Sequence, residues 1–215
     1  MSELLSPDIL HVIRTETRTW HSQVEQLVPV FEGGFGISDY KNLLERFYGF
    51  YAGFEPEVEG WASLRQIFPD WDDRRKLPWL EDDLRWLGLQ RQEISELPVC
   101  SRLPELRSAA AIFGALYVTE GSTLGGQVIC RQLSHALHLA PGRGASFFYG
   151  HGAETGSRWK GFTRALCEFA AAGTRTFEVQ REMVDSAVAT FKSIGRWLSL
   201  EEVIQETPKN ARITA

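Results

Sequence analysis

The longest apolar run of the chain extends from Pro104 to about Leu139 and carries three glycines close together, Gly121, Gly125 and Gly126. A run of this length predicts a helix. Each glycine lowers helix stability by about 1 kcal/mol relative to alanine, which is about 3 kcal/mol for the three. Gly121 and Gly125 share one helix face. Two explanations stand at equal weight: close packing against another helix, or a bare backbone surface for a flat ligand.

Proline and glycine divide the rest of the chain into further helical segments, with few alternating β-type runs. Ser6 and Pro7 predict the first helix start, with Ser6 as the N-cap. We therefore predict one all-α domain over residues 1–215, with its core over about 7–200 and a short tail over about 205–215. The expected helices cover residues 6–29, 38–56, a short stretch from 78, 104–139, 157–172 and 177–200, with a glycine-rich loop over 141–156.

Composition narrows the class of protein. The 215 residues carry a formal charge of −5, which disfavours a dedicated nucleic-acid binder. Three cysteines without CxxC spacing predict neither a disulfide framework nor a zinc ribbon. The sequence shows no secretory signal and no stretch of about 18 apolar residues, so we expect a cytoplasmic protein that does not enter a membrane. Seven tryptophans and 13 phenylalanines hint at an aromatic-rich pocket or core.

The opening helix combines an imidazole with an apolar stripe. His21 lies at the edge of that stripe, with Arg14 about 20° and Arg18 about 60° away around the axis. Arg14 is roughly 10 Å from His21 along the axis. This arrangement suits an apolar, metal-bearing ligand with an anionic rim. On spacing alone, a partly buried histidine with two solvated arginines is the favoured interpretation.

Three runs together resemble the heme oxygenase family, especially its bacterial members associated with phytochromes. They are IRTETRTWHSQVE, YVTEGSTLGGQVICRQL and SFFYGHGAETGSRWKGFTRAL, and the resemblance spans about Leu10 to Leu200. It implies an all-helical fold in which heme is sandwiched between a proximal helix and a kinked distal helix. It makes His21 the axial ligand of the heme iron. It also implies that Gly121, Gly125 and Gly126 press their backbone over the heme.

The same resemblance implies which side chains surround the heme edge and the oxygen site. Arg14, Arg18, Lys160 and Arg164 are the implied partners of the propionates, an arrangement that would set the rotation of the heme. Classical members of the family carry an aspartate directly after the first distal glycine, and here that residue is Ser122. The phytochrome-associated members use a similar EGS run. Ser122 and nearby backbone carbonyls would hold waters that supply protons.

The implied reaction uses heme as both cofactor and substrate and consumes O₂. Its products are biliverdin, CO and ferrous iron. The sequence carries no flavin or nicotinamide fingerprint, so electrons would come from a ferredoxin or an NADPH-dependent reductase. A phytochrome apoprotein is the implied recipient of biliverdin. Two alternatives stay open: a heme carrier or sensor on the same fold, and a heme-free enzyme of the thiamin-degrading or cofactor-synthesis type that shares the architecture.

Overall fold

The computed structural model describes residues 8–172 and 174–199, and this part of the chain is helical, without a β-strand. The all-α prediction is therefore confirmed. The elements are α1 (Ile9–Gln26), α2 (Ile37–Glu59), α3 (Leu64–Ile67), α4 (Trp71–Arg74), α5 (Leu77–Trp86), α6 (Arg91–Ser95), α7 (Ala109–Leu137), α8 (Ser146–Tyr149), the 3₁₀ turn η1 (Gly152–Glu154), α9 (Thr155–Ala171) and α10 (Thr176–Leu198).

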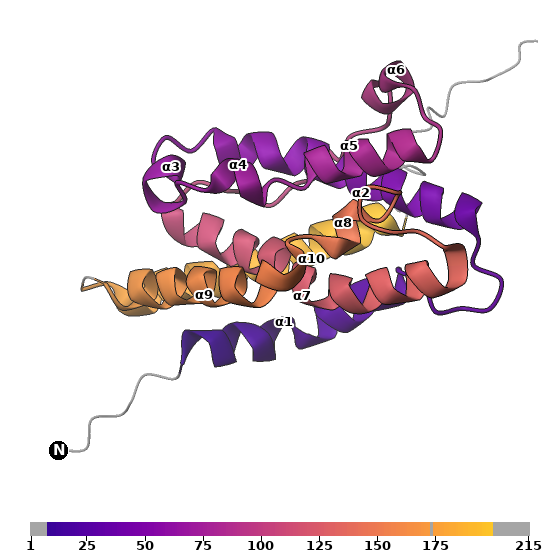
Figure 1. The fold of residues 1–215 in the computed structure, drawn as a ribbon. Helices are drawn as coiled ribbons and strands as arrows, with labels where there is room; N and C mark the ends of the chain where they lie inside the picture. Colours follow the sequence, from indigo (N-terminus) through magenta and orange to yellow (C-terminus); the bar gives the residue numbers. More distant parts are fainter. Residues whose placement is uncertain (1–7, 173, 200–215) are drawn as a thin grey trace, which may run out of the picture.

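The long helix α7 is the centre of the arrangement (Figure 1). Helix α10 packs along both α7 and α1, so that it joins the two. Helices α2 and α5 pair with each other in the upper layer of the view, and α8 and α9 pack on α7. The elements that carry the predicted site, α1 and α7, are thus held by a shared neighbour.

The first two helices differ from the prediction at their ends. Helix α1 begins after Asp8, whose carboxylate accepts a hydrogen bond from Leu10 N at 3.1 Å, whereas the predicted cap lies outside the described residues. It ends at Gln26, before Pro29. Helix α2 continues through Pro56 to Glu59. A proline in the last turn removes one backbone hydrogen bond only, which the packing of this aromatic helix tolerates.

Helix α7 runs without interruption through all of its glycines. Ser108 caps it by accepting a hydrogen bond from Ala111 N at 3.0 Å, and it ends at His138, which has a left-handed φ of 57°. Gly114 meets helix α10 so closely that a Cβ there would collide with the carbonyl oxygen of Met183. Close helix packing, one of the two explanations for the glycines, therefore applies at Gly114.

Two predictions about the connecting segments are wrong. The expected loop over residues 141–156 contains α8 and η1, and the short helices α3, α4 and α6 were not predicted. Elements of three to five residues are too short to show a helical period. Tertiary contacts hold them instead: the Asp83 carboxylate accepts hydrogen bonds from Ser146 N and Phe147 N, each at 2.8 Å, and fixes α8.

The core is rich in aromatic side chains, as the composition indicated. The largest fully buried side chains include Tyr40, Phe50, Phe54, Phe113 and Phe162. Within the described ranges, no helix has both the length and the apolar character that crossing a membrane requires.

Candidate functional site

A cavity of about 510 Å³ lies between the C-terminal half of α1 and the middle of α7. This volume is within the range of small-molecule and cofactor sites, roughly 300–1,000 Å³. Helices α2, α8 and α10 and the segments after α1 and before α5 supply the rest of its wall, and most of its lining is apolar. The lining residues are His21, Val24, Glu25, Val28, Phe31, Phe47, Phe50, Tyr51, Lys76, Val118, Thr119, Ser122, Thr123, Gly125, Gly126, Val128, Ile129, Phe147, Phe148, Phe191 and Ile194.

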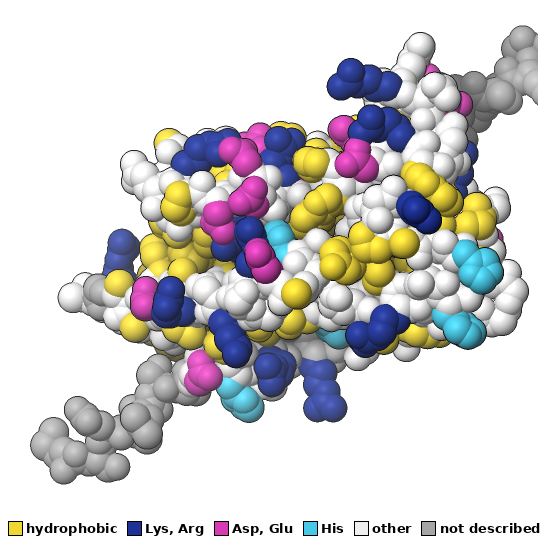
Figure 2. Space-filling view, in the orientation of Figure 1, with side chains coloured by type: hydrophobic (Ala, Val, Ile, Leu, Met, Phe, Trp, Pro, Cys, Tyr) yellow, Lys and Arg dark blue, Asp and Glu magenta, His cyan; other side chains and the backbone are white. Residues whose placement is uncertain are grey.

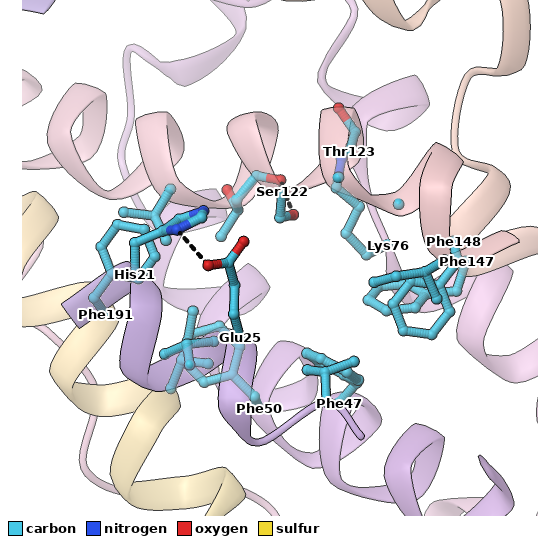
Figure 3. A pocket seen from close by; sticks show the side chains of 18 of the residues that line it. His21, Glu25, Phe47, Phe50, Lys76, Ser122, Thr123, Phe147, Phe148 and Phe191 are labelled. Carbon is cyan, nitrogen blue, oxygen red and sulfur yellow. Dashed lines mark hydrogen bonds and ion pairs between the residues drawn. The ribbon is translucent and has the colours of Figure 1, made fainter. Parts of the chain in front are cut away.

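His21 projects from α1 into this cavity (Figure 3). Its Nδ1 lies 3.3 Å from Oε2 of Glu25, one helical turn further on. The edge of its ring meets Phe191, with 5.6 Å between centroids. The side chain is 55% exposed. A carboxylate partner at Nδ1 favours the tautomer with its proton there, which leaves Nε2 as a lone-pair donor for a metal.

The glycines of α7 have three different environments. A Cβ on Gly125 would meet no atom within 4 Å, so this position presents bare backbone to the cavity. A Cβ on Gly126 would lie 2.5 Å from the carbonyl oxygen of Phe148, so Gly126 also packs against α8. Gly121 is absent from the lining, and a Cβ there would lie 3.5 Å from the Trp159 ring, which is an ordinary contact. The structure therefore brings Gly125 and Gly126, but not Gly121, to the cavity surface.

The four predicted anchoring cations, Arg14, Arg18, Lys160 and Arg164, lie outside the cavity lining. All four are exposed, two on α1 and two on α9. Arg14 interacts with the side chain of Tyr117 on α7: burial raises the pKa of that phenol, and the arginine partly opposes the rise. Within the described residues, none of the four forms an ion pair with an acidic group. Their assignment to the propionates stays a prediction.

An aromatic cluster from α2 and α8 closes the cavity opposite His21. Phe47 and Phe147 lie 5.0 Å apart between ring centroids, and Phe147 and Phe148 lie 4.9 Å apart. The number of phenylalanines predicted an aromatic-rich pocket or core, but not that these residues of α2 and α8 meet at one site. The spacing of aromatic residues along 38–56 was the feature of the sequence from which this cluster could have been predicted.

Ser122 of α7 and Tyr51 of α2 are two of the polar residues that line the cavity. The Ser122 hydroxyl donates a hydrogen bond to the carbonyl oxygen of Thr119 at 2.8 Å. Burial raises the pKa of the Tyr51 phenol, and an interaction with the Ser122 side chain partly opposes this. Tyr51 is therefore neutral throughout the physiological pH range.

Sequence analysis missed a buried group of charges beside the cavity. Glu55 of α2 accepts hydrogen bonds from Lys76 N at 2.5 Å and Leu77 N at 3.1 Å, and Arg75 Nε donates to it at 3.1 Å. Burial raises the pKa of Glu55, and these donors act against the rise. Lys76 and Glu120 continue the group towards α7. The residues carry no local motif, because they come from segments far apart in the chain.

The arrangement fits a flat, apolar ligand with a metal at its centre. Gly125 leaves a gap that a side chain would fill, and His21 lines the same cavity from α1. In the described part of the chain, no three His, Cys, Asp or Glu side chains are grouped to hold a metal ion. A metal in this cavity would therefore depend on His21 and on the ligand that carries it.

Comparison with known proteins gives one consistent result. The sequence profile of the heme oxygenase family matches residues 8–199. A heme oxygenase from Xanthomonas campestris pv. campestris is 37% identical over 115 residues, which are 50% of this chain and 64% of that protein. The match therefore spans less than two thirds of that relative's length.

Solved structures share the fold at low sequence identity. Heme oxygenase 2 from Chlamydomonas reinhardtii, solved without heme, superposes with a TM-score of 0.69 at 18% identity, covering 89% of this chain and 96% of that one. The NO- and CO-bound heme oxygenase from Neisseria meningitidis gives 0.69 at 19%, covering 90% and 92%. Heme oxygenase-1 from the cyanobacterium Synechocystis, in complex with heme, gives 0.66 at 17%, covering 93% and 95%.

Proposed function

Since the chain belongs to the heme oxygenase family, we propose that it binds heme between α1 and α7 and cleaves it oxidatively to biliverdin, CO and ferrous iron. The observation that carries the proposal is an apolar cavity lined both by the His21 imidazole of α1 and by the bare backbone of Gly125 on α7. An imidazole on one helix and a stretch of bare backbone at Gly125 on another suit the two faces of a porphyrin.

His21 would hold the iron through Nε2, and Glu25 would orient the ring through Nδ1. Bound heme supplies both the iron that activates O₂ and the carbon that is oxidised. The apolar side chains around it exclude bulk water. The bare backbone at Gly125 and Gly126 lets the porphyrin lie close to α7, so that a small molecule on that side is held against the ring edge.

Ser122 would position water on the α7 side of the heme. Its hydroxyl proton is given to the carbonyl oxygen of Thr119, so its oxygen is available as an acceptor. Waters bound there would supply the protons that the reaction consumes. Gly121 would not touch heme from the cavity surface, because it lies outside the lining and beside the Trp159 ring.

The exposed cations Arg14, Arg18, Lys160 and Arg164 would anchor the propionates at the solvent edge and thereby set which meso carbon faces the oxygen site. Electrons would come from a ferredoxin or an NADPH-dependent reductase. A phytochrome apoprotein that takes up biliverdin would be the recipient of the product, in line with the resemblance of the EGS run to phytochrome-associated members.

Hemin titration followed by turnover tests the proposal. One equivalent of hemin should produce a Soret band, and addition of ascorbate or a ferredoxin–reductase pair in air should replace it with the broad red band of biliverdin. His21→Ala should weaken the Soret band and abolish turnover, and added imidazole should restore both in part. A stable Soret band in the reduced wild type would indicate a heme carrier or sensor, and no spectral change with hemin would refute heme binding.

A further inference from the structure

The α7 wall of the cavity carries three hydroxyl side chains, on Thr119, Ser122 and Thr123. Two of them give their proton to the backbone of their own helix, as serine and threonine in helices often do. Ser122 donates to the carbonyl oxygen of Thr119 at 2.8 Å (Figure 3). Thr123 donates to the carbonyl oxygen of Glu120 at 2.6 Å. Neither of these two protons is therefore available to a ligand in the cavity.

Thr119 differs from both, because its hydroxyl has no hydrogen-bond partner among the residues that the structure describes. The residue is 3% exposed. A buried hydroxyl without a partner is unfavourable, so its presence in this wall calls for an explanation. A hydroxyl can donate one hydrogen bond and accept two. All of this capacity is open to a molecule that enters the cavity.

The Thr119 hydroxyl borders the cavity and is not enclosed by protein. Within the described ranges, two side-chain polar atoms are fully enclosed and without a partner, His151 Nε2 and Thr155 Oγ1. His151 lies among the charges that gather between α4 and α9 in Figure 2. Thr119 Oγ1 is not one of these atoms, so it keeps some accessible surface. Since Thr119 is almost wholly buried and lines the cavity, that surface faces the cavity.

Ser122 complements the free donor of Thr119. Residues three apart on a helix are neighbours, with about 5–6 Å between their Cβ atoms, so one small molecule can contact both hydroxyls. Because the Ser122 proton is engaged, its oxygen meets that molecule as an acceptor. Tyr51 of α2 interacts with the Ser122 side chain, and burial raises the pKa of its phenol. The wall thus offers a donor at Thr119 next to an acceptor at Ser122.

We propose that the Thr119 hydroxyl is the hydrogen-bond donor of the α7 wall to small ligands of heme iron, with Ser122 as the acceptor beside it. The inference rests on the proposed function, because it requires heme held by His21. A donor that is already in place in an apolar wall interacts more strongly with a negative ligand than the same donor in water.

Thermal unfolding of the heme-free protein tests the free hydroxyl first. Thr119→Val exchanges the hydroxyl for a methyl group of similar size, and no hydrogen bond within the protein is lost. This variant should therefore unfold at the temperature of the wild type or higher. The matched control is Thr190→Val on α10, outside the cavity lining, where the buried hydroxyl donates to the carbonyl oxygen of Ser186 at 2.8 Å. That variant should unfold at a lower temperature.

Fluoride binding to the ferric heme complex tests the donor itself, because fluoride accepts hydrogen bonds and cannot donate one. We expect Thr119→Val to weaken fluoride binding about tenfold, as loss of a hydrogen bond to a charged group would. Thr119→Ser keeps the hydroxyl and should restore most of the affinity. Ser122→Ala should weaken fluoride binding less than Thr119→Val, since the Ser122 proton is already engaged. Thr190→Val should leave the fluoride affinity unchanged.

Unchanged fluoride affinity in Thr119→Val would overturn this inference alone, because hemin binding by the wild type would still support the proposed function. A lower melting temperature of heme-free Thr119→Val would contradict a hydroxyl without a protein partner and overturn it as well. A larger loss in Ser122→Ala than in Thr119→Val, or an equal loss in Thr190→Val, would refute Thr119 as the donor. Failure of the wild type to bind hemin would overturn both proposals.

Discussion

His21 Nδ1 lies 3.3 Å from Oε2 of Glu25, and both side chains face the cavity between α1 and α7. The pair is built into one helix, since residues four apart share a face. It needs no tertiary contact to form, and the contact of the ring with Phe191 of α10 adds to the orientation that Glu25 gives.

The carboxylate of Glu25 should strengthen iron binding by His21. Hydrogen-bond partners of a metal ligand typically contribute about 10–100-fold to metal affinity. We expect Glu25→Ala to weaken hemin binding within that range and to lower the iron–histidine stretching frequency in resonance Raman spectra of the ferrous complex. Glu16→Ala, an exposed change on the same helix, is the control. An unchanged iron–histidine stretching frequency in Glu25→Ala would show that Glu25 does not affect the strength of the bond between His21 and iron.

Gly125 and Gly126 should respond differently to a side chain. Gly125→Leu places its side chain in open cavity space, so hemin affinity should fall sharply while thermal unfolding stays near that of the wild type. Gly126→Ala puts a Cβ 2.5 Å from Phe148 O, so the melting temperature should fall. Thermal unfolding and hemin titration of both variants measure the melting temperature and the hemin affinity separately. Normal hemin binding by Gly125→Leu would contradict the position of the porphyrin.

His151 should make stability depend on pH below 6.5. Burial, followed by the charges of Lys76 and Arg158, lowers its pKa from 6.5 to about 4, and Glu120 acts in the opposite direction. Between these values only the unfolded chain binds the proton. The free energy of unfolding therefore falls as the pH drops through this window, by about 3 kcal/mol at most, and has no contribution from His151 above it.

Urea unfolding at pH 7 and pH 4.5 measures this loss. His151→Gln should lose less stability on acidification than the wild type, whereas His135→Gln, an exposed change on α7, should behave as the wild type does. Direct NMR titration of the His151 ring should give a midpoint near 4. Equal acid sensitivity of the His151 variant and the wild type would contradict the shifted pKa.

The four exposed cations should contribute modestly to heme affinity. Their main effect should be on the orientation of the bound heme. Exposed ion pairs typically contribute about 0.2–1 kcal/mol, so Arg14→Ala should weaken hemin binding less than about fivefold. Chromatographic separation of the extracted biliverdin isomers should show a changed ratio. Arg181→Ala, which removes an exposed arginine on α10, is the control. An isomer ratio that survives removal of all four predicted cations would exclude them from setting the heme rotation.

The sequence could predict the long elements because each carries its own helical period. The stripe around His21 and the run through the glycines of α7 both belong to single helices, so their faces could be worked out from spacing. The family is confirmed, and the structure brings His21, Ser122, Gly125 and Gly126 to one cavity.

The remaining features depend on contacts between distant segments. Nothing near Lys76 in the chain indicates that it meets Glu120, which lies 44 residues later. Gly114, Gly121 and Gly125 look alike in sequence, but the first packs on α10, the second on α9, and the third faces the cavity. Only the fold separates these positions: close packing applies at Gly114, whereas Gly125 leaves open space in the cavity, where a ligand surface stays a prediction.

The contact between Gly126 and Phe148 has a mechanical consequence. Backbone meets backbone there, without an intervening side chain, so no change of rotamer can make room between α7 and α8. Asp83 also ties the start of α8 to α5. Admission of a large flat molecule therefore cannot rely on side-chain rearrangement at this part of the wall.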